Sequence, residues 1–467
     1  MKTEPLTRGL RAGAGLPDLH QVAHIPDPWA ALTTELKPPL TPDEARAEAY
    51  RCLLCGGPTT PAPCVQSCPS GIDIPNFVEA IARGDPTQAA STIMEANPLG
   101  GTCARVCPTE VLCEGSCVLI GEGQRALDIG RLQRFATDAV SDPAGIAIIA
   151  PMQQQNRNVA VIGAGPAGLA CAAVLASLGY GVTVYDGHTE AGGLVRYAIA
   201  PYRQLIEPLP VEVERLRRMG IRFVMGTRID IREAIQAVEA SCDAIFLGVG
   251  MGKDSALGIE GSDLSGVWSS LPFIEAIKSR QLPEIGDTVA VIGAGNTAMD
   301  VARESVRLGA KHVVVIYRRS REQAPAFPSE IAEAIEEGVE FVWLTAPVRF
   351  LGGDRLRSIE CQKMRLGEPD RSGRKRSEPI KGSEFELSVD TAILAIGQLP
   401  WSDLIPLIGV ADANGYPILV DPDTGQTQKA RYFTGGDVLN GGGSVVEAVR
   451  MGKIAADGIH RFLSTKE

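Results

Sequence analysis

Cysteine spacing is the clearest chemical pattern in this chain. Eight of the 11 cysteines lie between Cys52 and Cys117. They form four close pairs: Cys52 with Cys55, Cys64 with Cys68, Cys103 with Cys107, and Cys113 with Cys117. Thiolates at such spacings bind zinc or iron–sulfur clusters, whereas thiols in an oxidising compartment pair as disulfides. The stretch is therefore predicted to be a metal or disulfide centre.

Two prolines favour iron–sulfur clusters among these alternatives. Pro69 and Pro108 directly follow Cys68 and Cys107, and in ferredoxin-type sequences the cysteine before a proline ligates the second of two clusters. Disulfides are disfavoured because the first 30 residues show no secretory signal, which predicts a cytoplasmic protein. Structural zinc stays open, since its sites also use short cysteine spacings. We predict two cubane clusters.

A second pattern occurs twice and predicts dinucleotide binding. Val159–Gly165 (VAVIGAG) recurs as Val289–Gly295. Each copy is an apolar strand, a glycine turn and a helix, followed by another apolar strand. Glycines in such a turn let the backbone approach a pyrophosphate, which then lies at the positively polarised N-terminus of the helix.

The two copies differ where their ligands should differ. The strand after the first copy ends in Asp186, and a carboxylate there accepts hydrogen bonds from ribose hydroxyls and repels a 2′-phosphate. The strand after the second copy ends in Arg318 and Arg319, with Arg321 beyond, and guanidinium groups suit a 2′-phosphate. We therefore predict FAD or NAD at the first site and NADPH at the second. The alternative for the arginines is a solvated loop.

The elements that position these residues follow from the same sequence. A capping box at Thr41–Glu44 and apolar periodicity over residues 74–96 predict a small helical domain around the cysteines, after a proline-rich extended arm. Apolar strands are expected within Asp243–Gly250 and Asp390–Gly397, and a helix is expected from Ser444.

Composition excludes several classes of function. A length of 467 residues suggests about three domains, and 45% hydrophobic with 22% charged residues is typical of a soluble globular protein. The net charge of −11 argues against binding to nucleic acid or to a membrane surface. Glycines and a proline interrupt the uncharged run Val159–Tyr185, so strand–turn–helix–strand is predicted there and not a transmembrane helix.

Together these motifs resemble the family of glutamate synthase small subunits and of the NADPH-oxidising N-terminal half of dihydropyrimidine dehydrogenase. The likeness runs over nearly the whole chain from about Pro42. Asn97–Cys117 and Ile129–Phe135 look closest to the dihydropyrimidine dehydrogenase branch, whereas Tyr317–Pro325 is more similar to glutamate synthase small subunits. Both branches therefore stay open.

The resemblance implies the fold class and its boundaries. The fold would be α/β, with an α-helical two-cluster iron–sulfur domain before two Rossmann-like domains, the NADPH domain being inserted in the FAD domain. The prolines of residues 1–40 predict an extended arm, and the segments implied after it are the helical [4Fe–4S] domain over 41–150, the FAD domain over 151–285 and 386–467, and the NAD(P)H domain over 286–385.

The resemblance also implies metal ligands. One [4Fe–4S] cluster would take Cys52, Cys55, Cys64 and Cys117. The other would take Cys68, Cys107, Cys113 and the amide of Gln133, with Cys103 competing for that fourth position. A neutral amide in place of a thiolate alters the charge and the potential of a cluster. The chain departs from the family pattern in having eight residues between Cys55 and Cys64.

Dinucleotide ligands carry over in the same way. For FAD they are Gly163, Gly165, Pro166, Ala167, Gly168, Asp186, Gly193, Leu194, Arg203, Gly436, Asp437, Ser444 and Val445. For NADPH they are Gly295, Asn296, Thr297, Ala298, Arg318, Arg319 and Gly397, and charge and position add Arg321.

These parts predict an electron relay. NADPH delivers two electrons as hydride, a flavin accepts the pair and releases electrons singly, and iron–sulfur clusters carry one at a time. Hydride transfer needs no general acid or base, so no catalytic side chain is predicted. The chain shows no eightfold strand–helix repeat for an FMN barrel and no N-terminal cysteine suited to a glutaminase. We therefore predict an electron-input subunit with a larger catalytic partner of the dihydropyrimidine dehydrogenase or glutamate synthase type. The alternatives are a free-standing NAD(P)H:ferredoxin-type oxidoreductase and a zinc-containing nucleotide-binding regulatory protein.

Overall fold

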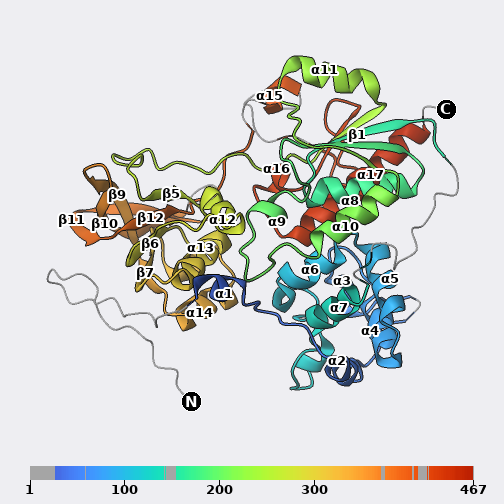
Figure 1. Ribbon diagram of the computed structural model, residues 1–467, viewed down its shortest axis with the longest axis horizontal. Helices are drawn as coiled ribbons and strands as arrows, with labels where there is room; N and C mark the ends of the chain where they lie inside the picture. The colour runs from blue at the N-terminus through green and yellow to red at the C-terminus, as the bar shows by residue number, and fades with distance from the viewer. Residues whose placement is uncertain are drawn as a thin grey trace. The chain divides into compact units, whose positions relative to one another are not determined.

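The chain divides into two compact units. The computed structural model describes residues 27–57, 59–140, 142, 154–369, 374–401, 404–408, 418 and 420–465. The large unit comprises Glu35–Lys253 and Gln398–Glu467, and the small unit comprises Asp254–Gly397 together with Met1–Thr34. Figure 1 shows the elements of both, each of which is described by itself below. The small unit therefore interrupts the large one in the sequence, as the resemblance implies for the NADPH domain.

A parallel five-stranded sheet forms the centre of the large unit. Its strands, in sheet order, are β13 (Tyr432–Thr434), β4 (Ala244–Leu247), β1 (Asn158–Ile162), β2 (Gly181–Tyr185) and β3 (Arg222–Val224). The first glycine motif follows β1, the central strand, where Ile162 pairs with Tyr185 and Leu247. This arrangement confirms the predicted strand–turn–helix–strand and places the turn at the carboxyl edge of the sheet, where dinucleotides bind.

Helices cover both faces of this sheet. One face packs against α8 (Pro166–Ser177), α10 (Leu209–Arg218) and α17 (Val445–Ser464). The other face packs against α11 (Arg232–Ser241) and α15 (Leu404–Ile408). Successive β1 side chains are buried on opposite sides, Val159 and Val161 facing the first layer and Ala160 and Ile162 the second. Burial on both faces explains why the strands are continuously apolar.

The small unit has a second parallel sheet and an antiparallel one. The parallel strands, in sheet order, are β5 (Val267–Ser269), β12 (Thr391–Leu394), β6 (Thr288–Ile292), β7 (His312–Tyr317) and β8 (Glu340–Trp343). The antiparallel strands are β9 (Thr345–Gly352), β10 (Leu356–Pro369) and β11 (Lys375–Ser388). The antiparallel sheet, which the sequence did not predict, packs on one face of β6 and β7.

Helices cover the other face of the parallel sheet in the small unit. They are α1 (Pro28–Thr33), α12 (Ser270–Lys278), α13 (Asn296–Arg307) and α14 (Pro328–Glu336). Because β5 and β12 pair within this sheet, the unit extends from Asp254 to Gly397, beyond the predicted segment 286–385. Helix α1 also differs from the extended arm predicted over 1–40, since its side chains Trp29 and Leu32 pack against the core of this unit; residues 1–26 lie outside the described residues.

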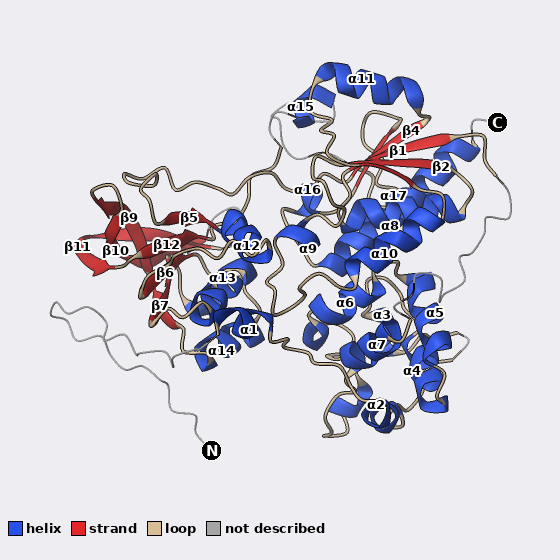
Figure 2. Ribbon diagram, viewed as in Figure 1, coloured by secondary structure: helices blue, strands red, loops and turns tan. Residues whose placement is uncertain are grey.

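The N-terminal part of the large unit, residues 35–140, is a helical domain, which Figure 2 draws as helices and loops. Its helices are α2 (Pro42–Ala49), α3 (Pro63–Gln66), α4 (Ile74–Arg83), α5 (Pro86–Ala96), α6 (Gly100–Val106) and α7 (Ile129–Asp138), with short 3-10 turns η1 (Thr109–Val111) and η2 (Val118–Ile120). The predicted capping box is present, because the Thr41 and Glu44 side chains each bond to the other residue's backbone N–H. Eight cysteines lie among these helices and their loops, and five of them lie in the apolar core or at its margin: Cys52, Cys64, Cys68, Cys113 and Cys117. None of the helices in the described ranges has the length and apolarity to span a bilayer.

Candidate iron–sulfur and dinucleotide sites

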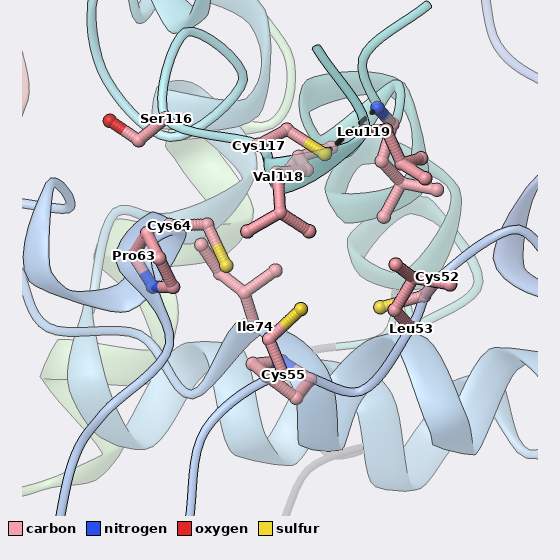
Figure 3. Close-up of a pocket in the computed structure, with 13 residues that line it drawn as sticks. Cys52, Leu53, Cys55, Pro63, Cys64, Ile74, Ser116, Cys117, Val118 and Leu119 are labelled. Carbon is pink, nitrogen blue, oxygen red and sulfur yellow. Dashed lines mark hydrogen bonds between the residues drawn. The ribbon is translucent and has the colours of Figure 1, made fainter. Parts of the chain in front are cut away.

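Four cysteines surround one hollow in the helical domain; we call them the first thiol group. Cys52 and Cys55 lie in the loop after α2, Cys64 lies on α3, and Cys117 precedes η2. Figure 3 shows their sulfur atoms turned toward the same space. The hollow encloses about 380 Å³, its open mouth included. In the part of the chain that the structure describes, no three or more His, Cys, Asp or Glu side chains are arranged to hold a single ion.

The environment of the first thiol group fits a cationic iron centre. Apolar side chains such as Ile74, Val118 and Ile129 line the hollow. Burial, followed by the neighbouring Cys52, raises the pKa of Cys64 to about 11. Burial is also the largest cause that raises the pKa of Cys52, and Cys55 and Cys117 add to it. Clustered thiols of this kind become thiolates when a bound metal centre compensates their charge. The eight-residue loop before Cys64 therefore does not keep it from this group.

The remaining four cysteines form a second thiol group: Cys68, Cys103, Cys107 and Cys113. A hydrogen bond with Cys103, then burial, raises the pKa of Cys107 well above its usual value, and Cys113 and Cys68 add to the rise. Burial raises the pKa of Cys113, with Glu114 and Cys68 contributing. Both groups thus have the chemistry predicted for cluster ligands, and the assignment of each ligand stays a prediction.

The two candidates for the eighth ligand, Cys103 of the second thiol group and Gln133, lie on the contacting helices α6 and α7. Cys103 is buried on α6 and bonds to Cys107. Gln133 is buried on α7, and its Nε2 donates to the carbonyl of Gly100 at 2.6 Å. Because that bond occupies the amide nitrogen, Oε1 is the coordinating atom that Gln133 retains. The structure is therefore compatible with either Cys103 or Gln133 as the eighth cluster ligand.

Glycines shape the first dinucleotide turn. A Cβ atom at Gly163 would lie 2.2 Å from the carbonyl oxygen of Gly248, and one at Gly168 would lie 1.9 Å from the carbonyl oxygen of Gly163. Neither position can carry a side chain, so the helix start packs closely on β1 and β4. Helix α8 begins at Pro166 without a side-chain cap, which leaves its first-turn N–H groups for an anionic ligand.

Asp186 lies at the end of β2, next to this turn. Its Oδ2 accepts the Ala164 N–H at 2.7 Å, and its Oδ1 accepts the His188 N–H at 2.8 Å. Burial is the largest single influence and opposes ionisation, but the hydrogen bonds from His188 and Ala164 together lower the pKa of Asp186 below its usual value. An ionised acceptor is held where a dinucleotide fold places the ribose hydroxyls.

The glycine segment near the carboxyl terminus, which includes Gly436, lies against the first turn of α8. Gly436 has a φ of +85°, and a Cβ atom there would lie 3.0 Å from the Cβ of Ala167 in the first turn of α8. Asp437 accepts the Gly443 N–H at 3.1 Å, and burial raises its pKa. Ser444 caps α17 in a capping box with Glu447. The fold thus brings together two predicted FAD ligands, Ala167 and Gly436, which are more than 260 positions apart in the sequence.

Three other predicted FAD ligands lie on the segment after Asp186. Gly193 precedes α9 (Leu194–Tyr197) with a φ of +54°, and a Cβ atom there would lie 2.9 Å from the Cα of Gly165. Leu194 is exposed at the start of that helix. Arg203 places its guanidinium carbon 5.5 Å from the centre of the Tyr202 ring.

The second dinucleotide turn repeats the first in the small unit. A Cβ atom at Gly293 would lie 2.1 Å from the carbonyl oxygen of Ala395, and α13 begins at Asn296 without a side-chain cap. Thr297 is exposed in its first turn and Ala298 is buried. Asn296 accepts the Phe327 N–H at 3.0 Å, which fixes the following loop. Gly397, after β12, has a φ of +97° and open space around it.

The arginines after β7 do not share one environment. Arg318 and Arg321 are exposed. Arg319 is buried, and its Nε donates to the Lys375 carbonyl at 2.8 Å, so it supports the start of β11. Arg318 and Arg321 are therefore the two exposed candidates for the 2′-phosphate contact, and the assignment of all three arginines stays a prediction.

Sequence reasoning missed several charged residues near these sites. Arg374 donates to the Tyr317 hydroxyl at 3.1 Å and so joins the end of β7. Glu212 and Lys453, from helices of the first dinucleotide fold, bond to the backbone of the helical domain. The partners of Glu212 and Lys453 are backbone groups far away in the sequence, so no sequence motif indicates these contacts.

Two family profiles match the chain. One, described as dihydropyrimidine dehydrogenase domain II, 4Fe-4S cluster, matches residues 30–144. The other, described as pyridine nucleotide-disulphide oxidoreductase, matches residues 157–452. The first match includes both thiol groups, and the second includes both glycine turns.

The chain is also similar to individual proteins of known name and to solved structures. The glutamate synthase [NADPH] small chain of Escherichia coli K12 is 35% identical over 447 residues, which cover 92% of this chain and 93% of that protein. The beta subunit of the NADP(+)-dependent formate dehydrogenase of Moorella thermoacetica is 34% identical over 432 residues, which cover 87% of this chain and 60% of that protein. The structure of Mycobacterium tuberculosis FprA in complex with NADPH matches with a TM-score of 0.54 and 18% identity, covering 67% of this chain and 85% of that one. This last likeness is one of fold.

Proposed function

The chain belongs to the family of iron–sulfur pyridine nucleotide oxidoreductases that includes the glutamate synthase small chains, and on this premise we propose that it is the electron-input subunit of a larger enzyme. As a member of that family it is an NAD(P)H-dependent oxidoreductase that uses FAD and [4Fe–4S] chemistry. The proposal adds that it prefers NADPH, that it holds two clusters, and that a separate, larger catalytic subunit receives the electrons.

One observation carries the proposal: the helical domain and the first dinucleotide fold form one compact unit. Glu212 of α10 accepts the N–H groups of Gly101 and Thr102 on α6. Lys453 of α17 donates to the carbonyls of Ser70 and Ala96. Because both links cross from the helical domain to the first dinucleotide fold, they support a fixed position of the thiol groups relative to the turn predicted to bind FAD.

In this mechanism the chain's own residues bind and orient. When bound, FAD supplies the step from two-electron hydride transfer to single electrons, and the clusters carry those electrons one at a time. The first turn of α8 would bind the FAD pyrophosphate and Asp186 its ribose. The first turn of α13 would bind the NADPH pyrophosphate, and Arg318 and Arg321 its 2′-phosphate. The two thiol groups would hold iron. None of these roles requires a side chain to move a proton.

We place the electron exit at the first thiol group because exposed apolar side chains surround it. Five large apolar residues lie within three positions of Cys52 or Cys117 and are 37–68% exposed. We call them the apolar rim: Tyr50, Leu53, Leu54, Val118 and Ile120. Apolar and aromatic side chains of this kind form the centres of protein interfaces. The names of two relatives, a small chain and a subunit beta, describe parts of larger enzymes, and this supports a large catalytic subunit as the occupant of the rim.

Anaerobic spectroscopy tests the proposal. Addition of NADPH to the iron-loaded protein should bleach both flavin and cluster absorption, and an artificial acceptor should sustain NADPH oxidation. The isolated chain should reduce neither uracil nor 2-oxoglutarate. An iron- and sulfide-loaded preparation that NADPH does not bleach would refute the electron relay. Turnover of either substrate by the isolated chain would refute the need for a partner, and rapid transfer to ferredoxin alone would identify a free-standing reductase instead.

A further inference from the structure

A lysine of the first dinucleotide fold reaches into the helical domain beside a predicted cluster ligand. Lys453 lies in the third turn of α17, and its Nζ donates to the carbonyls of Ser70 at 2.9 Å and Ala96 at 2.7 Å. Ser70 follows Cys68 by two residues, and Lys453 is close enough to Cys68 to interact with it electrostatically. Figure 1 shows α17 alongside α8, with α6 of the helical domain nearby. The ammonium group therefore lies next to the second thiol group.

The backbone of Lys453 is fixed against the predicted flavin site. Its neighbour Gly452 lies so close to α8 that a Cβ atom would be 2.1 Å from the carbonyl oxygen of Ala167. Ala167 is in the turn predicted to bind FAD, and α17 itself begins next to Ser444. One helix thus has predicted flavin ligands at its start and a cation beside the second thiol group in its third turn.

The charge of Lys453 has no carboxylate partner in ion-pair contact among the described residues. Both hydrogen-bond acceptors are neutral carbonyls. The lysine is partly buried, and burial lowers its pKa while Cys68 and then Asp457 act in the opposite direction.

We propose that Lys453 is a positioning residue that raises the reduction potential of the cluster held by Cys68. The inference rests on the proposed function. Reduction adds one electron, and so one negative charge, to the cluster. A nearby cation stabilises that reduced form, because the potentials of iron–sulfur centres follow local charge and burial. The same side chain, through its two hydrogen bonds, also holds the helical domain against α17.

Four variants separate charge from hydrogen bonding. Lys453→Gln removes the charge and retains an NH2 group with two N–H donors, one bond nearer the backbone. Lys453→Met removes the charge and the donors, and Lys453→Arg keeps the charge. Arg461→Gln is the matched control, because Arg461 is exposed at the end of the same helix. The measurement is a chemical redox titration of the purified, iron-loaded protein, followed by electron paramagnetic resonance without NADPH or partner.

We expect both neutral variants to weaken reduction of the second cluster about tenfold, which is about 59 mV for a one-electron couple. Lys453→Arg and Arg461→Gln should titrate like the wild type. Amide hydrogen exchange around Ser70 and Ala96 should accelerate in Lys453→Met and much less in Lys453→Gln, since only the former loses both hydrogen bonds.

A wild-type potential in Lys453→Gln would overturn the inference and leave Lys453 a purely structural link. If Lys453→Met does not assemble clusters, the Gln and Arg variants still decide the question. A different result would refute the proposed function alone. If the clusters are reduced in the chemical titration but not by NADPH, the electron relay is refuted, and the effect of Lys453 on the potential can still be measured. A wild-type protein without cluster signals would refute both.

Discussion

At the scale of single residues, nucleotide selectivity should depend on Arg318 and Arg321. Both are exposed after β7, where a dinucleotide fold places the 2′-phosphate. Replacing both with Gln should raise the KM for NADPH about 10- to 100-fold, as the loss of charge-assisted hydrogen bonds implies, with little change for NADH. Steady-state kinetics with an artificial acceptor measures both constants. Arg349→Gln, which removes a surface arginine of β9 in the same unit, is the control. Equal losses with both nucleotides would show that these arginines do not recognise the phosphate.

Arg319 shows what the sequence alone could and could not predict at this scale. The diagnostic position after the second apolar strand was evident, because strand length and glycine spacing are local. Which arginine faces outward was not, because Arg318 and Arg319 lie in the bend after β7, where no regular periodicity applies: Arg318 is exposed and Arg319 is buried. The Lys375 carbonyl, which accepts the Arg319 Nε–H, is 56 residues away in the sequence, so no local pattern marks that contact.

At the scale of elements, Glu212 should control how α6 joins α10. Its carboxylate accepts the N–H groups of Gly101 at 2.8 Å and Thr102 at 3.0 Å, and the Thr102 hydroxyl at 2.6 Å. Glu212→Ala leaves these donors without an acceptor, so the free energy of unfolding should fall by about 2–3 kcal/mol. Glu212→Gln retains an acceptor oxygen and should lose much less. Urea unfolding of the iron-loaded protein gives both values; an Ala variant as stable as the wild type would contradict this role.

The same carboxylate predicts a pH dependence of stability. Burial raises the pKa of Glu212 above its ordinary value of 4.5, although the bonds from Thr102 and Gly101 act against it. The folded protein then binds this proton more tightly than the unfolded chain does. Stability from Glu212 is therefore complete below 4.5 and is lost as pH rises through the raised pKa. Compared with Glu212→Gln, the wild type should lose stability as pH rises over that range; parallel pH profiles of unfolding would contradict it.

Elements with local signals were predictable, and those made by distant contacts were not. Both strand–turn–helix units and the capping box before α2 follow from glycines, caps and apolar periodicity within about 30 residues. The antiparallel strands β9–β11 carry many charged side chains and become a layer only by packing on β6 and β7. Helix α1 is likewise fixed by Trp29 and Leu32 against the small unit. The links made by Glu212 and Lys453 span 111 and 383 residues, which no local pattern encodes.

At the scale of the whole molecule, the apolar rim should determine transfer to the catalytic partner. Tyr50 and Ile120 are exposed members of the rim that do not line the hollow of the first thiol group. Changing both to Glu should cost little stability, since exposed sites tolerate substitution, and should preserve NADPH oxidation with an artificial acceptor. Binding to the large subunit isolated from the native complex should weaken at least about tenfold, because charges would replace apolar contacts at an interface centre.

The rim prediction is decided by comparing two reactions of the same variant. Partner-dependent turnover and the dissociation constant should change together, whereas the cluster spectrum and the artificial-acceptor rate should stay at wild-type values. Ile231→Glu is the control, because Ile231 is a similarly exposed apolar residue at the start of α11 on the dinucleotide-binding part. If the rim variant transfers electrons to the partner normally while Ile231→Glu does not, the exit lies on the dinucleotide-binding part.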